Sequence, residues 1–210
     1  MKAPARQHVP RALLLVLASC QSPPPPSPWH ELFDGSSLGQ FVSTEFGGQG
    51  EVTVRDGRLQ LGIGNPLTGV TWTGALPPAE YELEVTSRRE LGSDFFCGLT
   101  FPVGDSHLTL VLGGWGGSVC GLSSLNGLDA AHNETRRTRY FAPGRDCTVR
   151  VIVTRDRVAV TLDGEDFLGV ALAGRVCGLR PEVLLSRPLG LASFATEASV
   201  RSCRWRALTR

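Results

Sequence analysis

The side chains best suited to chemistry gather in one short run, DAAHNE, which extends from Asp129 to Glu134. The run brings Asp129, His132 and Glu134 together within six residues, with the amide of Asn133 between them. Oxygen and nitrogen donors of this kind bind a divalent metal ion or hydrogen-bond to the hydroxyl groups of a sugar. The spacing is not that of an EF-hand loop, so a calcium site of that type is not predicted. A solvated polar loop without a ligand is the alternative interpretation.

A second candidate, Trp115, lies between two pairs of glycines in the segment GGWGG, residues 113–117. This segment lacks the third glycine of a dinucleotide-binding fingerprint and the Lys-Ser/Thr pair of a phosphate-binding loop, so it predicts no nucleotide site. In one interpretation the indole is a flat stacking platform for a sugar, and the glycines leave room for the ligand. In the other, the indole fills the core where two backbones cross closely.

Three glutamates, Glu80, Glu82 and Glu84, alternate with apolar residues in AEYELEV. Glycosidases use paired carboxylates, one as nucleophile and one as acid. However, the E-x-D-x-x-E spacing in which some glycosidases carry them on a strand is absent here. The favoured interpretation is therefore the solvent-facing side of a half-buried strand.

The segments around these candidates predict short strands joined by tight turns. Asp56-Gly57 and Asp163-Gly164 are strong hairpin signals, and no stretch keeps a helical period over ten residues. We therefore predict an all-β fold, an antiparallel two-sheet sandwich of the concanavalin A or laminin-G jelly-roll type. The polar segment 123–139, which contains DAAHNE, interrupts the strands, and a connection of that length is usually functional or disordered.

Length and composition indicate one globular domain with a sizeable core, because the chain has 210 residues. The formal net charge is +1, so a nucleic-acid partner is not predicted. Five cysteines follow Cys20, at positions 97, 120, 147, 177 and 203. Their number is odd and no C-x-x-C spacing occurs, so a zinc or redox motif is not predicted. We expect most of these thiols to be small buried apolar groups.

The first residues have the order of an export signal. Three basic residues precede the apolar run 12–18, which is too short to span a bilayer, and Ser19 and Cys20 follow. The ending LASC resembles the lipobox of bacterial lipoprotein signals, in which the cysteine is lipidated. A plain secretory signal with an incidental cysteine is the alternative.

These features predict three regions: a lipoprotein signal peptide at 1–19, a lipidated Cys20 with a proline-rich linker at 20–28, and a jelly-roll domain at 29–210. We expect the protein to be exported and held in the bacterial cell envelope, at the outer membrane, by a lipid anchor at Cys20.

Several stretches resemble the 3-keto-disaccharide hydrolase family, and together they extend from about Leu32 to Leu208. The stretches are WHELFDGSSLGQF, VRDGRLQL, YELEV, LDGEDF and SVRSCRWRAL. The longer block GGWGGSVCGLSSLNGLDAAHNET resembles a planctomycete subgroup of the same family.

The resemblance implies a concanavalin-like jelly roll that cleaves 3-keto-glycosides. In that chemistry a base removes the proton at C2, which the keto group acidifies, and the glycosidic oxygen leaves, often with help from a divalent metal ion. The resemblance implies Asp129, His132 and Glu134 as base or metal ligands. It also implies sugar contacts from Trp115, Asn133 and Arg136.

Other functions stay open at this point. Many family members carry Asn-Ser-Gly where this chain has Phe96-Cys97-Gly98-Leu99, so the catalytic set is not fully matched. A non-catalytic glycan-binding or adhesion module is therefore the alternative function, and a purely structural lipoprotein is a third.

Overall fold

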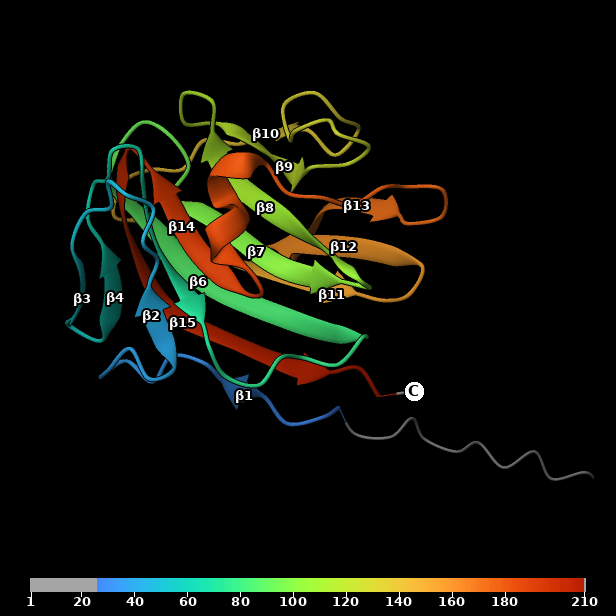
Figure 1. Cartoon of the computed structure of the whole chain (residues 1–210), viewed down its shortest axis with the longest axis horizontal. Coiled ribbons are helices and arrows are strands. Elements are labelled where there is room, and N and C mark those ends of the chain that lie inside the picture. Colours follow the sequence, from blue (N-terminus) through green and yellow to red (C-terminus); the bar gives the residue numbers. More distant parts are fainter. Residues whose placement is uncertain (1–25, 210) are drawn as a thin grey trace, which may run out of the picture.

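The computed structural model describes residues 26–209, whose strands form a two-layer β-sandwich (Figure 1). The predicted all-β fold with two antiparallel sheets is confirmed. The predicted signal peptide, the lipid attachment at Cys20 and most of the linker lie outside the described residues. Within residues 26–209, no helix is long and apolar enough to cross a membrane.

Sheet A has eight strands in the order β13-β12-β11-β6-β15-β4-β3, with β1 paired to β15. The strands are β1 (His30–Glu31), β3 (Val52–Arg55), β4 (Arg58–Leu61), β6 (Tyr81–Gly92), β11 (Cys147–Val153), β12 (Arg157–Leu162), β13 (Glu165–Ala171) and β15 (Thr196–Ala207). Two long strands, β6 and β15, pair along most of their length at the centre of this sheet.

Sheet B has seven strands in the order β10-β9-β8-β7-β14-β5-β2. The strands are β2 (Phe41–Ser43), β5 (Leu67–Trp72), β7 (Cys97–Val103), β8 (Ser106–Gly114), β9 (Val119–Ser123), β10 (Arg137–Thr138) and β14 (Gly190–Phe194). A short 3-10 helix, η1 (Pro181–Ser186), packs on β5 and β14. Figure 1 shows η1 in front of sheet B, on the side away from sheet A.

Both predicted hairpins form. The turn between β3 and β4 has φ of 54° at Asp56 and 71° at Gly57, and the turn between β12 and β13 has 53° at Asp163 and 87° at Gly164. Two consecutive positive φ angles are the geometry of the type I′ hairpin turn, which Asp-Gly favours.

The core lies between the sheets and is built from alternate residues of each strand. Tyr81, Leu83 and Val85 of β6 point inward as the alternation predicts. Four of the five described cysteines are core residues and all five are free thiols: Cys97, Cys120, Cys147, Cys203 and the half-buried Cys177. Burial raises the pKa of Cys97 to about 12 and that of Cys120 to about 11, so these thiols are unreactive near neutral pH.

The sequence predicts a solvent-facing row of glutamates on the outer face of sheet A, but two of these glutamates are covered by partners. Glu84 points outward, but only 6% of it is exposed because its carboxylate pairs with Arg150 and Arg204, each at 2.6 Å. Glu82 is similarly covered and pairs with Arg206 at 2.6 Å. The alternation of the strand does not reveal these partners, because they come from β11 and β15.

Trp29 lies on this same outer face of sheet A. Its ring stacks against the guanidinium groups of Arg204 and Arg206, at 4.6 and 4.5 Å from the ring centroid. Cation–π contacts of this kind stabilise a local arrangement by about 0.5–1 kcal/mol each at exposed sites. The described chain therefore begins against sheet A, on the face opposite to η1.

Candidate functional site

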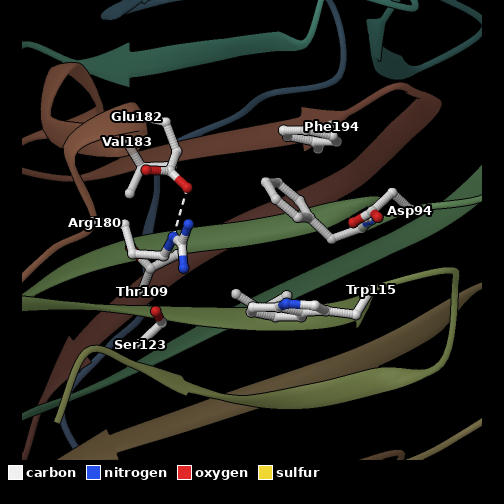
Figure 2. A pocket seen from close by; sticks show the side chains of 10 residues that line it. Asp94, Thr109, Trp115, Ser123, Arg180, Glu182, Val183 and Phe194 are labelled. Carbon is white, nitrogen blue, oxygen red and sulfur yellow. Dashed lines mark hydrogen bonds and ion pairs between the residues drawn. The ribbon is translucent and has the colours of Figure 1, made fainter. Parts of the chain in front are cut away.

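A pocket of about 220 Å³ opens on the outer face of sheet B, next to η1. Figure 2 shows its lining side chains, which come from the segment before β7, from β8, from the turn after it, from β9, from η1 and the residue before it, and from β14. The lining residues are Asp94, Phe95, Thr109, Val111, Trp115, Ser123, Arg180, Glu182, Val183 and Phe194. The pocket is smaller than the roughly 300–1,000 Å³ typical of sites for drug-sized ligands, so it suits a single ring-sized group.

Strand alternation explains why this face is available. In β8, Leu108, Leu110 and Leu112 enter the core, so Thr109 and Val111 face outward. The hydroxyl of Thr109 bonds at 2.8 Å to that of Thr100 on the neighbouring strand β7, which holds this part of the floor in place. The sheet thus supplies a flat, rigid base, and the walls come from the loops and η1.

Trp115 forms one wall of this pocket. Its side chain is not part of the core: 40% of the residue is exposed, and Figure 2 shows the indole lying across the pocket beside Thr109 and Ser123. Of the two interpretations of GGWGG, the structure excludes the one in which the indole fills the core. Large aromatic side chains exposed in a pocket are characteristic of binding surfaces.

The glycines of GGWGG are required by the backbone of this turn. Gly113, Gly116 and Gly117 have φ of 73°, 86° and 105°, and Trp115 itself has 48°. Non-glycine residues rarely adopt positive φ, so glycines surround the single residue that must carry a side chain here. Most residues of this turn thus have the positive φ that glycine adopts readily, and Trp115 is the one residue of GGWGG that carries a side chain.

Arg89 holds this turn in place from the inside. Its guanidinium donates from Nη2 to the carbonyls of Gly113, Gly117 and Asp94 at 3.0, 3.1 and 3.0 Å. A further bond from Nη1 reaches the carbonyl of Phe141 at 3.4 Å. Arg89 is only 5% exposed, and burial lowers its pKa, while the nearby charge of Asp94 acts in the opposite direction.

The contact between Arg89 and the turn also explains why position 113 is a glycine. A Cβ placed on Gly113 would lie 2.5 Å from Nη2 of Arg89, whereas a Cβ on Gly116 would meet nothing within 4 Å. Arg89 was not among the residues predicted for the site. The signal was present, because Arg89 continues the inward-facing register of Tyr81, Leu83 and Val85, where a charged residue is unusual.

Asp94 closes the other side of the turn. Its carboxylate accepts hydrogen bonds from the backbone N–H of Phe95 at 2.7 Å and of Gly116 at 3.3 Å. Each carboxylate oxygen keeps further acceptor capacity, and the residue lines the pocket. Asp94 therefore fixes the position of Trp115 and offers negative charge beside it.

Arg180 and Glu182 form the opposite wall (Figure 2). Nε of Arg180 donates to Glu182 at 2.5 Å, and its Nη1 donates to Asp129 at 2.8 Å. Neither residue was predicted for the site, because nothing in the local sequence pattern indicates that η1 lies over sheet B. The second oxygen of Asp129 bonds to Nδ1 of His132 at 2.7 Å.

The predicted site residues are thus divided by the structure. Asp129 and His132 touch each other and connect to the pocket through Arg180, but neither lines it. The amide of Asn133 is used to fold its own loop: it donates to the carbonyls of Leu122 and Asp129 at 2.7 and 2.8 Å.

The remaining two predicted residues point elsewhere. Glu134 pairs with Arg175 at 2.7 Å, and Arg136 is exposed outside the pocket lining. Within the described part of the chain, no group of three His, Cys, Asp or Glu side chains could hold a metal ion. The predicted ligand set Asp129, His132 and Glu134 is therefore not assembled, because arginines occupy the carboxylates of its first and last members.

The fold resembles those of solved carbohydrate-related proteins. The Crh5 transglycosylase in complex with NAG shares 14% identity over 89% of this chain and 89% of its own, with a TM-score of 0.62. The exoplasmic/lumenal domain of VIP36 in its Ca²⁺/Man3GlcNAc-bound form shares 12% over 86% and 89%, with a TM-score of 0.57.

SCLam, a non-specific endo-β-1,3(4)-glucanase from family GH16, shares 12% identity over 87% of this chain and 94% of its own, with a TM-score of 0.55. Likeness at such identities shows the fold alone, which is the predicted concanavalin A-like jelly roll. No protein-family model matches the chain, and no curated protein sequence matches it. Membership of the 3-keto-disaccharide hydrolase family stays a prediction.

Proposed function

We propose that this protein binds carbohydrate in the pocket over sheet B, with Trp115 as the platform on which one sugar unit stacks. The observation that carries the proposal is the outward-facing indole, held on a positive-φ turn by the buried Arg89. Such a platform exists before the ligand arrives, so binding does not have to order it.

The rest of the lining suits a sugar. The apolar C–H face of a pyranose packs against an indole, and its hydroxyls need nearby acceptors and donors. Asp94 and Glu182 supply acceptors on two sides, and Arg180 supplies a donor. The structural neighbours include proteins crystallised with NAG and with Man3GlcNAc, which supports a carbohydrate ligand for this fold.

Glycan binding by the Trp115→Ala variant tests this proposal. We expect isothermal titration with a glycan that the unaltered protein binds to show a loss of about tenfold or more, equivalent to about 1.4 kcal/mol. Trp29→Ala is the matched control, because it removes an indole from the opposite face. Equal affinity in all three proteins, with the fold retained by circular dichroism, would exclude the pocket as the glycan site.

A second candidate function is cleavage of 3-keto-glycosides, and the pairing of Asp129 with His132 favours it. A carboxylate bonded to Nδ1 orients an imidazole and leaves Nε2 to accept a proton, which is the arrangement of a general base. Arg180 connects Asp129 to the pocket wall. In this function His132 would take the C2 proton of a 3-keto sugar, and the electron pair of that C–H bond would form a C1=C2 double bond. The glycosidic C1–O bond would break and release an alcohol, whose oxygen takes up a proton.

Incubation of the protein with 3-keto-glycosides, with and without divalent metal ions, tests this second function. We expect turnover that His132→Gln abolishes, while Trp115→Ala raises the substrate concentration required. Glycan binding without turnover under any metal would leave the protein as a binding module. The described residues do not hold a metal ligand set, so no step is assigned to a metal ion.

We also propose that Cys20 is lipidated after removal of residues 1–19 and that the domain is exposed in the bacterial cell envelope. The basic start, the apolar run and the LASC ending support this. Metabolic labelling with a fatty acid tests it, and we expect the label to be lost in Cys20→Ala.

A further inference from the structure

We propose that the pocket selects an amino sugar, a sugar unit that carries a protonated amine. This inference rests on the proposed function, because it names the ligand class of the same pocket. Three features carry it: the carboxylates that face the pocket, the engagement of its arginine, and its aromatic walls.

The charges that face the pocket favour a cation. Asp94 and Glu182 lie on opposite sides of the cavity, as Figure 2 shows, and both line it. Glu182 is exposed, and only one of its carboxylate oxygens is engaged by Arg180. An ammonium group beside either carboxylate gains a charge-assisted hydrogen bond.

The arginine in the wall is already paired. Arg180 donates to Glu182 at 2.5 Å and to Asp129 at 2.8 Å, so two carboxylates surround one guanidinium. Arg89, a further cation nearby, is buried behind the turn, where it donates to four backbone carbonyls. Two carboxylates, Asp94 and Glu182, and one guanidinium line the pocket, so its charge is net negative, and a uronic acid or sulfated sugar would face that charge unbalanced.

Three aromatic side chains line the pocket. Trp115, Phe95 and Phe194 line the pocket, and Val111 and Val183 complete its apolar surface. Phe95 and Phe194 contact each other with ring centroids 5.7 Å apart, so they form one continuous wall. Aromatic faces attract cations, and indole does so most strongly. A neutral sugar uses these rings for stacking alone, whereas an amino sugar also uses their attraction for its charge.

Titration of the full-length protein with oligosaccharides of equal length tests the proposal. The probes are β-1,4-linked glucosamine, N-acetylglucosamine, glucose and glucuronate oligomers, at low ionic strength and slightly acid pH. We expect the glucosamine oligomer to bind about tenfold or more tightly than its N-acetylated counterpart, and the glucuronate oligomer to bind least. Added salt should reduce this preference, because it screens charge.

Two variants connect the preference to the pocket. In Glu182→Gln we expect the ratio of glucosamine to N-acetylglucosamine affinity to fall by about fivefold or more. Glu165→Gln is the matched control, because it removes an exposed carboxylate at the start of β13 in sheet A, and its ratio should equal that of the unaltered protein.

The outcomes separate this inference from the proposed function. Equal affinity for neutral and amino sugars, lost in Trp115→Ala, would overturn the amino-sugar preference and leave carbohydrate binding intact. Binding of choline as tight as that of glucosamine would show a cation site without sugar recognition, and would overturn the amino-sugar assignment. Binding of none of the oligomers would overturn both proposals.

Discussion

Replacing Gly113 by alanine should damage the protein much more than the same replacement at Gly116, although both glycines belong to one turn. Both positions have positive φ, 73° and 86°. Each alanine therefore costs about 1–2 kcal/mol for the left-handed backbone conformation. Replacing glycine by alanine also reduces the conformational entropy of the unfolded chain. This effect is the same at both positions, so it cancels when the two variants are compared.

The difference arises from Arg89. The new Cβ at position 113 would lie 2.5 Å from Nη2, and it also approaches the carbonyl oxygen of Gly117 at 3.1 Å. Arg89 cannot move aside freely, because it is buried and bonded to the turn. Displacing a hydrogen bond to a charged group costs about 1.5–3 kcal/mol. We therefore expect Gly113→Ala to lose about 2.5–5 kcal/mol in the free energy of unfolding, and Gly116→Ala about 1–2 kcal/mol.

Urea denaturation of the two variants and the unaltered protein measures this difference, and thermal melts should show about 2–4 °C per kcal/mol for a domain of this size. Glycan affinity measured in parallel should fall in Gly113→Ala, because the displaced guanidinium no longer holds the carbonyls that orient Trp115. Losses that agree within about 0.5 kcal/mol would refute the reasoning, since the Arg89 contact is the main physical difference between the two positions.

Three further predictions concern parts of the fold outside the turn. Burial raises the pKa of Glu84, but hydrogen bonds and charge from Arg150 and Arg204 outweigh it and lower the pKa below its ordinary 4.5. The stability that Glu84 contributes is therefore present at neutral pH and lost as the pH falls through the lowered value, so the gap between the unaltered protein and Glu84→Gln in denaturation curves should close under acid conditions. Asn133→Ala should cost about 2–4 kcal/mol in denaturation experiments, because it removes the amide donor to the carbonyl of Leu122 and the acceptor of the buried N–H and hydroxyl of Thr135. Alkylation of the native protein, read by mass spectrometry, should modify Cys177 before any other described cysteine, because Cys177 alone among them is not buried.

The sequence was sufficient to predict the fold class, because its signals are local. Asp56-Gly57 and Asp163-Gly164 specify hairpin turns through backbone preference, and alternation assigns Tyr81, Leu83 and Val85 to the core. These preferences act between near neighbours, so they are readable without knowledge of the fold.

The site could be predicted only in part, because it is assembled from distant segments. Trp115 could be singled out as a candidate, since an indole among glycines is unusual. Its partners could not: Arg180 and Glu182 reach the pocket through the placement of η1, and Arg89 through long-range pairing of β6. Asp129 and Glu134 were predicted as joint ligands, but in the structure they pair with Arg180 and Arg175.

Because Trp29 contacts sheet A, a pulling force applied on the N-terminal side of the domain would act on this sheet first. Trp29 contacts Arg204 and Arg206 of β15, and β1 pairs with the same strand. Such a force would therefore be transmitted to β15 and to its long partner strand β6. The pocket opens on the opposite layer and shares none of these contacts. Under the proposed attachment at Cys20, the layer that carries the pocket would face away from the anchored end, and tension along the chain would reach β6 and β15 before the pocket.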